Sequence, residues 1–265
     1  MSDPFAYLKS IGESGDGPHD IARVALKLAA LDHPGKSLEP YLAHLNEIDE
    51  AMRAGRGLIR RVGDGAQLLA SLFADRLGYE GDRLTYDDPK NADLMAVIDR
   101  RRGLPVALGI LYIHAARAGG MRASGLNTQG HFVIRITHRH DDVTVDPFNN
   151  GSVLTGDRVP AALRDAAIAE PVSDTDVLLR LQNNLKIRAL EAKDHERGLE
   201  LARRMTLIAP RRPDLWFDMG RINEALGVLG SARKAYETCL ELAKAGEPLH
   251  NEAVLSLANL KRRLN

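Results

Sequence analysis

Residues 130–135 read Gly130-His131-Phe132-Val133-Ile134-Arg135, and residues 145–148 read Val145-Asp146-Pro147-Phe148. Their β-branched and apolar content predicts two short strands, joined by the polar turn 138–142. One strand carries a histidine and the next ends in an aspartate, which is how a cysteine-type active site holds its base and orienter. The chain has one cysteine, Cys239, far downstream, so the usual nucleophile is missing.

The surrounding segments predict an α+β core over about residues 90–155. Helices are expected over 91–102 and 106–118, and the second is apolar on all sides, as a buried helix is. Pro105 suits the first turn of that helix, where a missing amide hydrogen costs little. The segments 122–126, 131–137 and 143–145 predict a small antiparallel sheet.

Upstream of this core the chain is predicted to be helical from about residue 20 to residue 77. Apolar residues recur at helical spacing over 21–28, 38–52 and 66–77. The polar stretch 79–89 is rich in Gly and Asp and is predicted to be a loop. We expect a first domain over residues 1–170, formed by this helical segment and the core.

The remaining residues, 171–265, predict a domain of helical repeats. Trp216, Gly220, Ala232 and Tyr236 stand at the offsets of the tetratricopeptide pattern, and one repeat length upstream the hydrophobic spacing recurs. We predict two repeats, 179–212 and 213–246, and a capping helix over 249–264. Cys239 falls on an inner helix face, which predicts a core thiol. Because two repeats are fewer than usually stand alone, we expect them to pack on the core.

Composition restricts the partners and the compartment. Lys+Arg and Asp+Glu number 36 each, which gives no electrostatic case for nucleic acid or an acidic membrane as a partner. A lone cysteine, an N-terminus without signal-peptide features and the absence of a bilayer-length apolar run predict a cytoplasmic protein.

Two polar clusters have simple interpretations. The run Arg100-Arg101-Arg102 is predicted to be a solvated helix end, favoured by the helix dipole. His138, His140 and the neighbouring aspartates could hold a metal ion. They fall in a predicted hairpin turn, where polar residues accumulate, so we expect neither a metal nor a cofactor.

The segment Asn91–Gly151 resembles the transglutaminase-like superfamily. More closely, it resembles the bacterial branch of SirB-type invasion-regulator homologues, which joins such a core to C-terminal tetratricopeptide repeats. With the helical N-terminal part and the repeats, the resemblance covers nearly the whole chain. It is carried by the order and spacing of four motifs: Arg101-Arg102-Gly103-Leu104-Pro105-Val106, Arg117-Ala118-Gly119-Gly120-Met121, Gly130-His131-Phe132 and Asp146-Pro147-Phe148-Asn149.

The resemblance implies a triad in which a cysteine opens the buried helix two residues after a glycine. Counting forward from Gly103 and backward from Gly120 leads to Pro105, while His131 and Asp146 match the other two members. Proline has no nucleophile, and a proline here looks usual in the SirB-type branch. No confident catalytic residue follows, only the candidate vestigial triad of His131, Asp146 and Pro105.

Three roles for the pair remain open. In the first, the chain is a non-catalytic binding or regulatory module whose repeats take a protein or peptide partner. In the second, it is a hydrolase or acyltransferase that uses His131 and Asp146 with water or an unconventional nucleophile; Ser124 and Thr128 are the nearby hydroxyls. In the third, the pair is a structural hydrogen bond that joins two strands. The sequence does not indicate an oligomeric state.

Overall fold

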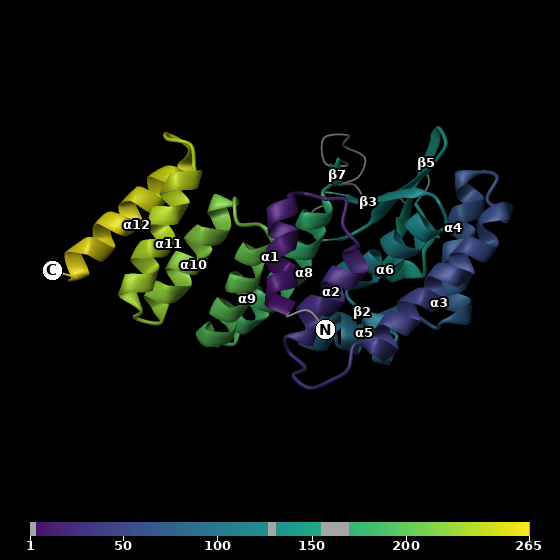
Figure 1. Cartoon of the computed structure of the whole chain (residues 1–265), viewed down its shortest axis with the longest axis horizontal. Coiled ribbons are helices and arrows are strands. Elements are labelled where there is room, and N and C mark those ends of the chain that lie inside the picture. Colours follow the sequence, from purple (N-terminus) through teal and green to yellow (C-terminus); the bar gives the residue numbers. More distant parts are fainter. Residues whose placement is uncertain (1–3, 127–130, 155–169, 265) are drawn as a thin grey trace. The chain divides into compact units, whose positions relative to one another are not determined.

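The computed structural model describes residues 4–126, 131–154 and 170–264 (Figure 1). The chain divides into two compact units. One is Asp16–Leu181, and the other joins Met1–Gly15 to Gln182–Asn265. The chain is mostly helical with a small antiparallel sheet, which confirms the predicted fold class.

Five strands of the described residues form one sheet in the unit Asp16–Leu181, in the order β6-β5-β4-β3-β7. Every neighbouring pair is antiparallel. In the β4–β5 hairpin His138 lies opposite Asp141, so residues 139–140 make a two-residue turn, with Arg139 at φ 56°. The strands are β3 Arg122–Leu126, β4 Ile134–His138, β5 Asp141–Asp146, β6 Ser152–Val153 and β7 Pro171–Val172.

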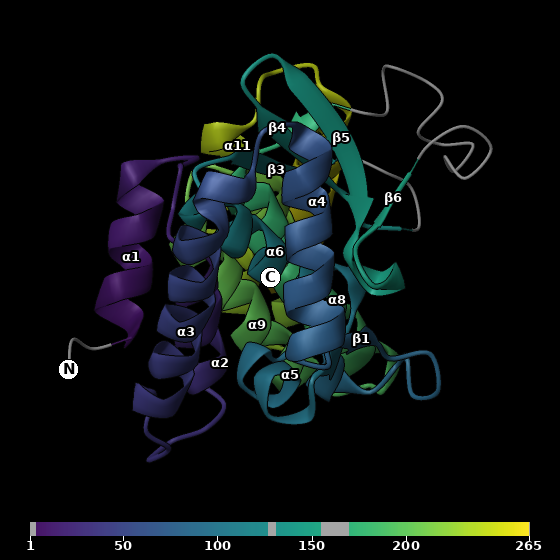
Figure 2. The same ribbon diagram turned by 90° about the vertical axis from the view of Figure 1, so that its right-hand side faces the viewer.

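The helix α6 (Pro105–Ala118) is the centre of this unit. Eleven of its residues are buried, as its all-round apolar sequence predicts. It packs against β3 and β4 and also against α3 (Glu39–Gly55) and α4 (Val62–Ala70), which flank it in Figure 2. Gly109 permits this packing, because a Cβ there would lie 2.3 Å from the ring of Phe132.

Some of the other helical segments of this unit begin at an aspartate that caps them. Asp20 accepts the Arg23 amide at the start of α2, and Asp93 accepts the Ala96 amide at the start of α5. The helical segments are α2 Ile21–Ala30, α3 Glu39–Gly55, η1 Arg56–Leu58, α4 Val62–Ala70, the π-helical η2 Ser71–Arg76, η3 Pro89–Ala92 and α5 Leu94–Arg100.

The second unit contains α1 and the repeat helices. Gly220 lies against the ring of Tyr236, where a Cβ would come within 2.5 Å, so this pair of the repeat pattern is a packing contact. Cys239 is fully buried in the same core, as predicted, and burial raises the pKa of its thiol. The helices are α1 Pro4–Ser14, α8 Asp174–Glu191 (from Gln182 on), α9 His195–Ile208, α10 Pro213–Ala225, α11 Leu229–Leu242 and α12 Pro248–Leu264.

Helix α1 is the element that the periodicity missed. It packs on α9, where a Cβ at Gly12 would lie 2.1 Å from the carbonyl oxygen of Leu207. Gly12 weakens the helical signal in the sequence, yet the close approach requires it. Residues 4–15 therefore group with the repeats, whereas the sequence placed them in one domain with the core.

Among the described helices, none combines the length and the apolarity that crossing a bilayer demands.

Candidate functional site

The structure brings His131 and Asp146 together. The imidazole Nε2 lies 2.8 Å from Oδ2 of Asp146. Asp146 ends β5, whereas His131 precedes β4, which begins at Ile134 and not at His131 as the alternation predicted. The side chain of His131 is 29% exposed and that of Asp146 only 3%, so the imidazole is accessible and the carboxylate is not.

The carboxylate of Asp146 is held by four donors. Oδ1 accepts the amides of Phe148 (3.0 Å) and Asn149 (3.2 Å), and Oδ2 accepts the Asn149 side chain (2.5 Å) besides His131. Burial alone would raise the pKa of Asp146, but the hydrogen bonds from His131 and Asn149 outweigh it and hold this pKa below its usual value. Asp146 is therefore a carboxylate at neutral pH and can orient the imidazole through Nε2.

Aromatic and cationic side chains surround the pair. The ring of Phe148 meets His131 edge-on at 6.3 Å between centroids and meets Tyr86 edge-on at 5.9 Å. The Arg83 guanidinium stands 5.2 Å over the same ring and donates to the side chain of Asn149. None of these flanking contacts was predicted, because Arg83 and Tyr86 lie in a loop with no sequence periodicity.

Arg180 approaches the pair from helix α8. Its guanidinium donates to the carbonyl oxygen of His131 (3.1 Å) and stands 5.4 Å from the ring centre of Phe132. Desolvation lowers the pKa of Arg180. The backbone of His131 is thus fixed from one side and its ring from the other, as a base in an active site would be.

Pro105, the expected nucleophile position, is the buried first residue of α6. Gly109, one turn later on the same helix face, packs against Phe132, the neighbour of His131. Helix α6 also packs against η4 (Pro147–Asn149), the segment that follows Asp146. The helix that would carry the thiol is therefore in contact with both segments of the pair.

Of the two candidate hydroxyls, Ser124 is the one that the structure describes. In the β3–β4 register Ser124 lies opposite Arg135, four residues beyond His131, and Thr128 lies outside the described residues. Tyr112, which the apolar pattern of α6 did not distinguish from core, carries a further hydroxyl. Its side chain is fully buried, and the hydroxyl has no hydrogen-bond partner within the described residues. Burial, and then the charge of Asp146, raise the pKa of Tyr112, so it stays a neutral phenol at physiological pH.

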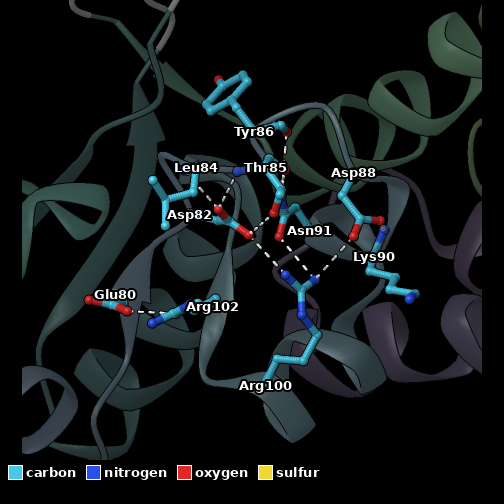
Figure 3. A network of polar contacts seen from close by, with 10 residues as sticks. All are labelled: Glu80, Asp82, Leu84, Thr85, Tyr86, Asp88, Lys90, Asn91, Arg100 and Arg102. Atoms are coloured by element: carbon cyan, nitrogen blue, oxygen red, sulfur yellow. Dashed lines mark hydrogen bonds and ion pairs between the residues drawn. The ribbon is translucent and has the colours of Figure 1, made fainter.

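The three consecutive arginines lie at the end of α5, as predicted, but only Arg102 is exposed, and each of the three bonds to a polar side chain. Figure 3 shows Arg100 between Asp82 (2.8 Å) and Asn91 (3.2 Å), and Arg102 beside Glu80 (2.6 Å). Arg101, at φ 58°, donates to the hydroxyl of Tyr79. All three arginines therefore bond the end of α5 to the segment 79–91.

The segment 79–91 also contacts the chain on either side of the candidate triad, just before Pro105 and just after Asp146. The strand β1 (Glu80–Gly81) pairs in parallel with β2 (Arg102–Gly103), which directly precedes Leu104 and Pro105. On its other side Gly81 touches the ring of Phe148, where a Cβ would lie 2.5 Å away. The same segment, Glu80–Gly81, therefore contacts both the chain that leads into α6 and the chain that follows Asp146.

Comparison with known proteins gives two family matches. Residues 31–187 match the model described as the transglutaminase-like superfamily, and residues 185–259 match a tetratricopeptide repeat. A UPF0162 protein of Xylella fastidiosa (strain 9a5c) is 29% identical over 179 residues, 63% of this chain and 64% of that protein. A UPF0162 protein of Vibrio cholerae is 24% identical over 233 residues, 84% and 86% of the two chains.

A more distant match is F-box only protein 21 of Mus musculus. It is 29% identical over 127 residues, which are 42% of this chain and 20% of that protein. This chain thus spans less than two thirds of the Xylella relative and about a fifth of the mouse protein.

Proposed function

The chain belongs to the transglutaminase-like superfamily, and from this premise we propose that it is a non-catalytic binding module of the SirB-type branch. In this proposal the His131 site holds a peptide or small ligand without turning it over. The tetratricopeptide repeats contact a protein partner, as such repeats generally do, and the protein acts in the cytoplasm.

The observation that carries the proposal is an intact base–orienter pair whose two segments pack against the helix that begins with Pro105. A thiol, a base and an oxyanion site are all needed for acyl transfer of this type, and position 105 supplies no nucleophilic atom. The pair itself has the distance, the burial and the charge of a working one.

Exposure of the imidazole favours binding over a purely structural hydrogen bond. A pair that only joined two strands would gain from full burial, yet His131 stays 29% exposed while its partner is sealed. The ring of His131 meets Phe148 edge-on, and aromatic side chains commonly line the ligand sites of proteins.

The experiment is a selection of displayed random twelve-residue peptides against the full chain, repeated with His131→Ala and Asp146→Asn. We expect the wild type to enrich peptides that the His131→Ala variant binds at least tenfold more weakly, and to turn over none of a broad amide and ester panel. Turnover by the wild type that disappears in His131→Ala would establish the hydrolase or acyltransferase alternative. If the two variants change only the unfolding temperature, the pair is structural.

A further inference from the structure

Four consecutive exposed residues, Arg83–Tyr86, lie beside the His131 site; we call them the recognition loop. The side chain of Leu84 is 90% exposed, the highest value among the exposed large apolar residues of the described chain, and Tyr86 is 40% exposed. A single exposed leucine is ordinary on a protein surface. Leu84 differs from such a leucine because hydrogen bonds hold the backbone on both sides of it.

Two buried polar side chains hold that backbone from beneath. Oδ1 of Asp82 accepts the amides of Leu84 (3.1 Å) and Thr85 (2.8 Å). The Asn91 amide donates to the carbonyl oxygens of Thr85 (2.6 Å) and Tyr86 (3.4 Å), as Figure 3 shows. Asp82 is 4% exposed and Asn91 fully buried, so water competes little for these bonds.

Arg100 locks both of these side chains to helix α5. Its guanidinium bonds to Oδ2 of Asp82 and to Oδ1 of Asn91, and stands 4.0 Å from Asp88. An exposed loop whose backbone is already held by hydrogen bonds loses little conformational entropy when a ligand binds, which favours affinity. The network therefore fixes the backbone from which the exposed side chains project.

The recognition loop is continuous with the His131 site. Tyr86 meets Phe148 edge-on, and Phe148 meets His131 in the same way. Arg83 covers the Phe148 ring and bonds to the neutral Asn149. Within the described residues its guanidinium has no carboxylate in ion-pair range, unlike those of Arg100 and Arg102.

We propose that the recognition loop Arg83–Tyr86 selects the ligand of the His131 site: an extended peptide whose acidic side chain pairs with Arg83 and whose apolar side chain packs on Leu84 and Tyr86. This rests on the proposed binding function. The exposed guanidinium of Arg83 favours an anionic partner, and the exposed side chains of Leu84 and Tyr86 favour an apolar one. Together they define an acidic–apolar segment.

The test uses the peptides enriched on the full-length wild type. We expect Asp or Glu within three residues of Leu, Ile or Phe in most of them. For the tightest peptide, Leu84→Ser and Arg83→Gln should each weaken binding about tenfold, measured by fluorescence anisotropy. Leu58→Ser is the matched control, because Leu58 is 72% exposed on η1 and belongs to no such network; binding should not change. A peptide with lysine in place of each acidic residue should not bind.

Three results would overturn the inference. The first is an enriched set without acidic residues. The second is binding that His131→Ala abolishes but Leu84→Ser and Arg83→Gln leave intact, which would keep the binding site and remove the loop from it. The third is self-association, seen by sedimentation, that Leu84→Ser abolishes, because a second copy would then occupy the loop. If loop variants weaken binding but His131→Ala does not, the proposed role of His131 fails instead.

Discussion

Position 105 is where this chain lacks the thiol that the pair His131 and Asp146 would activate. Proline occupies the first turn of α6, where its missing amide hydrogen leaves no bond unmade. The packing of Gly109 on Phe132 places the same helix face against the segment that carries His131. A thiol at position 105 should therefore meet the imidazole.

The variant Pro105→Cys, made together with Cys239→Ser, tests this geometry. The imidazole should promote the thiolate, so iodoacetamide should alkylate the introduced thiol at pH 6 at least ~10-fold faster than when His131→Ala is added. Rates are followed by mass spectrometry of the intact chain. Equal rates with and without the imidazole would show that position 105 does not face His131.

A second residue-scale prediction concerns Tyr112. Its hydroxyl is buried and unpartnered within the described residues, while its ring stacks on Phe73 at 4.3 Å. Tyr112→Phe keeps the stack and removes the unsatisfied group, so the free energy of unfolding should stay unchanged or rise by up to about 1 kcal/mol. Urea titration measures it. A loss above 1 kcal/mol would mean that the hydroxyl bonds to an ordered water.

The sequence was informative about these residues to different degrees. His131, Asp146 and Pro105 were found because motif order and spacing are local properties of the chain. Arg83, Tyr86 and Arg180 were not found, because they reach the site through a loop and a helix distant in sequence. The buried hydroxyl of Tyr112 was not predicted, because an aromatic residue in an apolar helix looks like an ordinary core residue.

At the scale of elements, the loop over residues 79–91 shows why charge runs mislead. The pattern predicts a loop and a solvated helix end, but the structure joins the two through buried carboxylate and amide groups. Hydrophobic periodicity predicted α6, β3 and the repeat helices. A network of polar side chains has no such period, so the sequence pattern does not predict it. An arginine run that follows a helix and faces an Asp-rich loop is the only signal available, and it is weak.

The network should give the unfolding free energy an acid dependence. Hydrogen bonds from Thr85 lower the pKa of Asp82 from 3.8 to about 2, so the folded chain binds this proton less readily than the unfolded one. The contribution to stability is complete above about pH 4 and disappears as the pH falls towards 2. Asp82→Asn should cost about 2–4 kcal/mol at pH 7 and flatten the slope between pH 4 and 2 in urea titrations.

Glu80→Gln is the control for this variant. It removes the partner of Arg102 in the same segment, but both side chains are about half exposed, so the loss should stay below about 1 kcal/mol. Equal losses for the two substitutions would mean that burial of Asp82 does not set its contribution.

At the scale of the whole molecule, the chain order does not follow the division into compact units. Residues 4–15 pack on α9, about two hundred positions away in the sequence, and the contact is backbone to backbone at Gly12. Helical periodicity predicts each repeat helix but contains no information on which distant segment covers α9. The N-terminal helix is thus part of the repeat unit by packing alone.

Gly12→Val tests that assignment. The new side chain would overlap the carbonyl oxygen of Leu207 and the ring of Pro210, so α1 must shift away from α9. We expect a loss of about 1–3 kcal/mol, seen as faster amide hydrogen exchange in α9, while β4 and β5 keep their protection. Ser10→Ala, at an exposed position of the same helix, should leave exchange in α9 unchanged. Unchanged exchange of α9 in Gly12→Val would remove α1 from the repeat unit, and equal acceleration in β4 would mean that the two units open together.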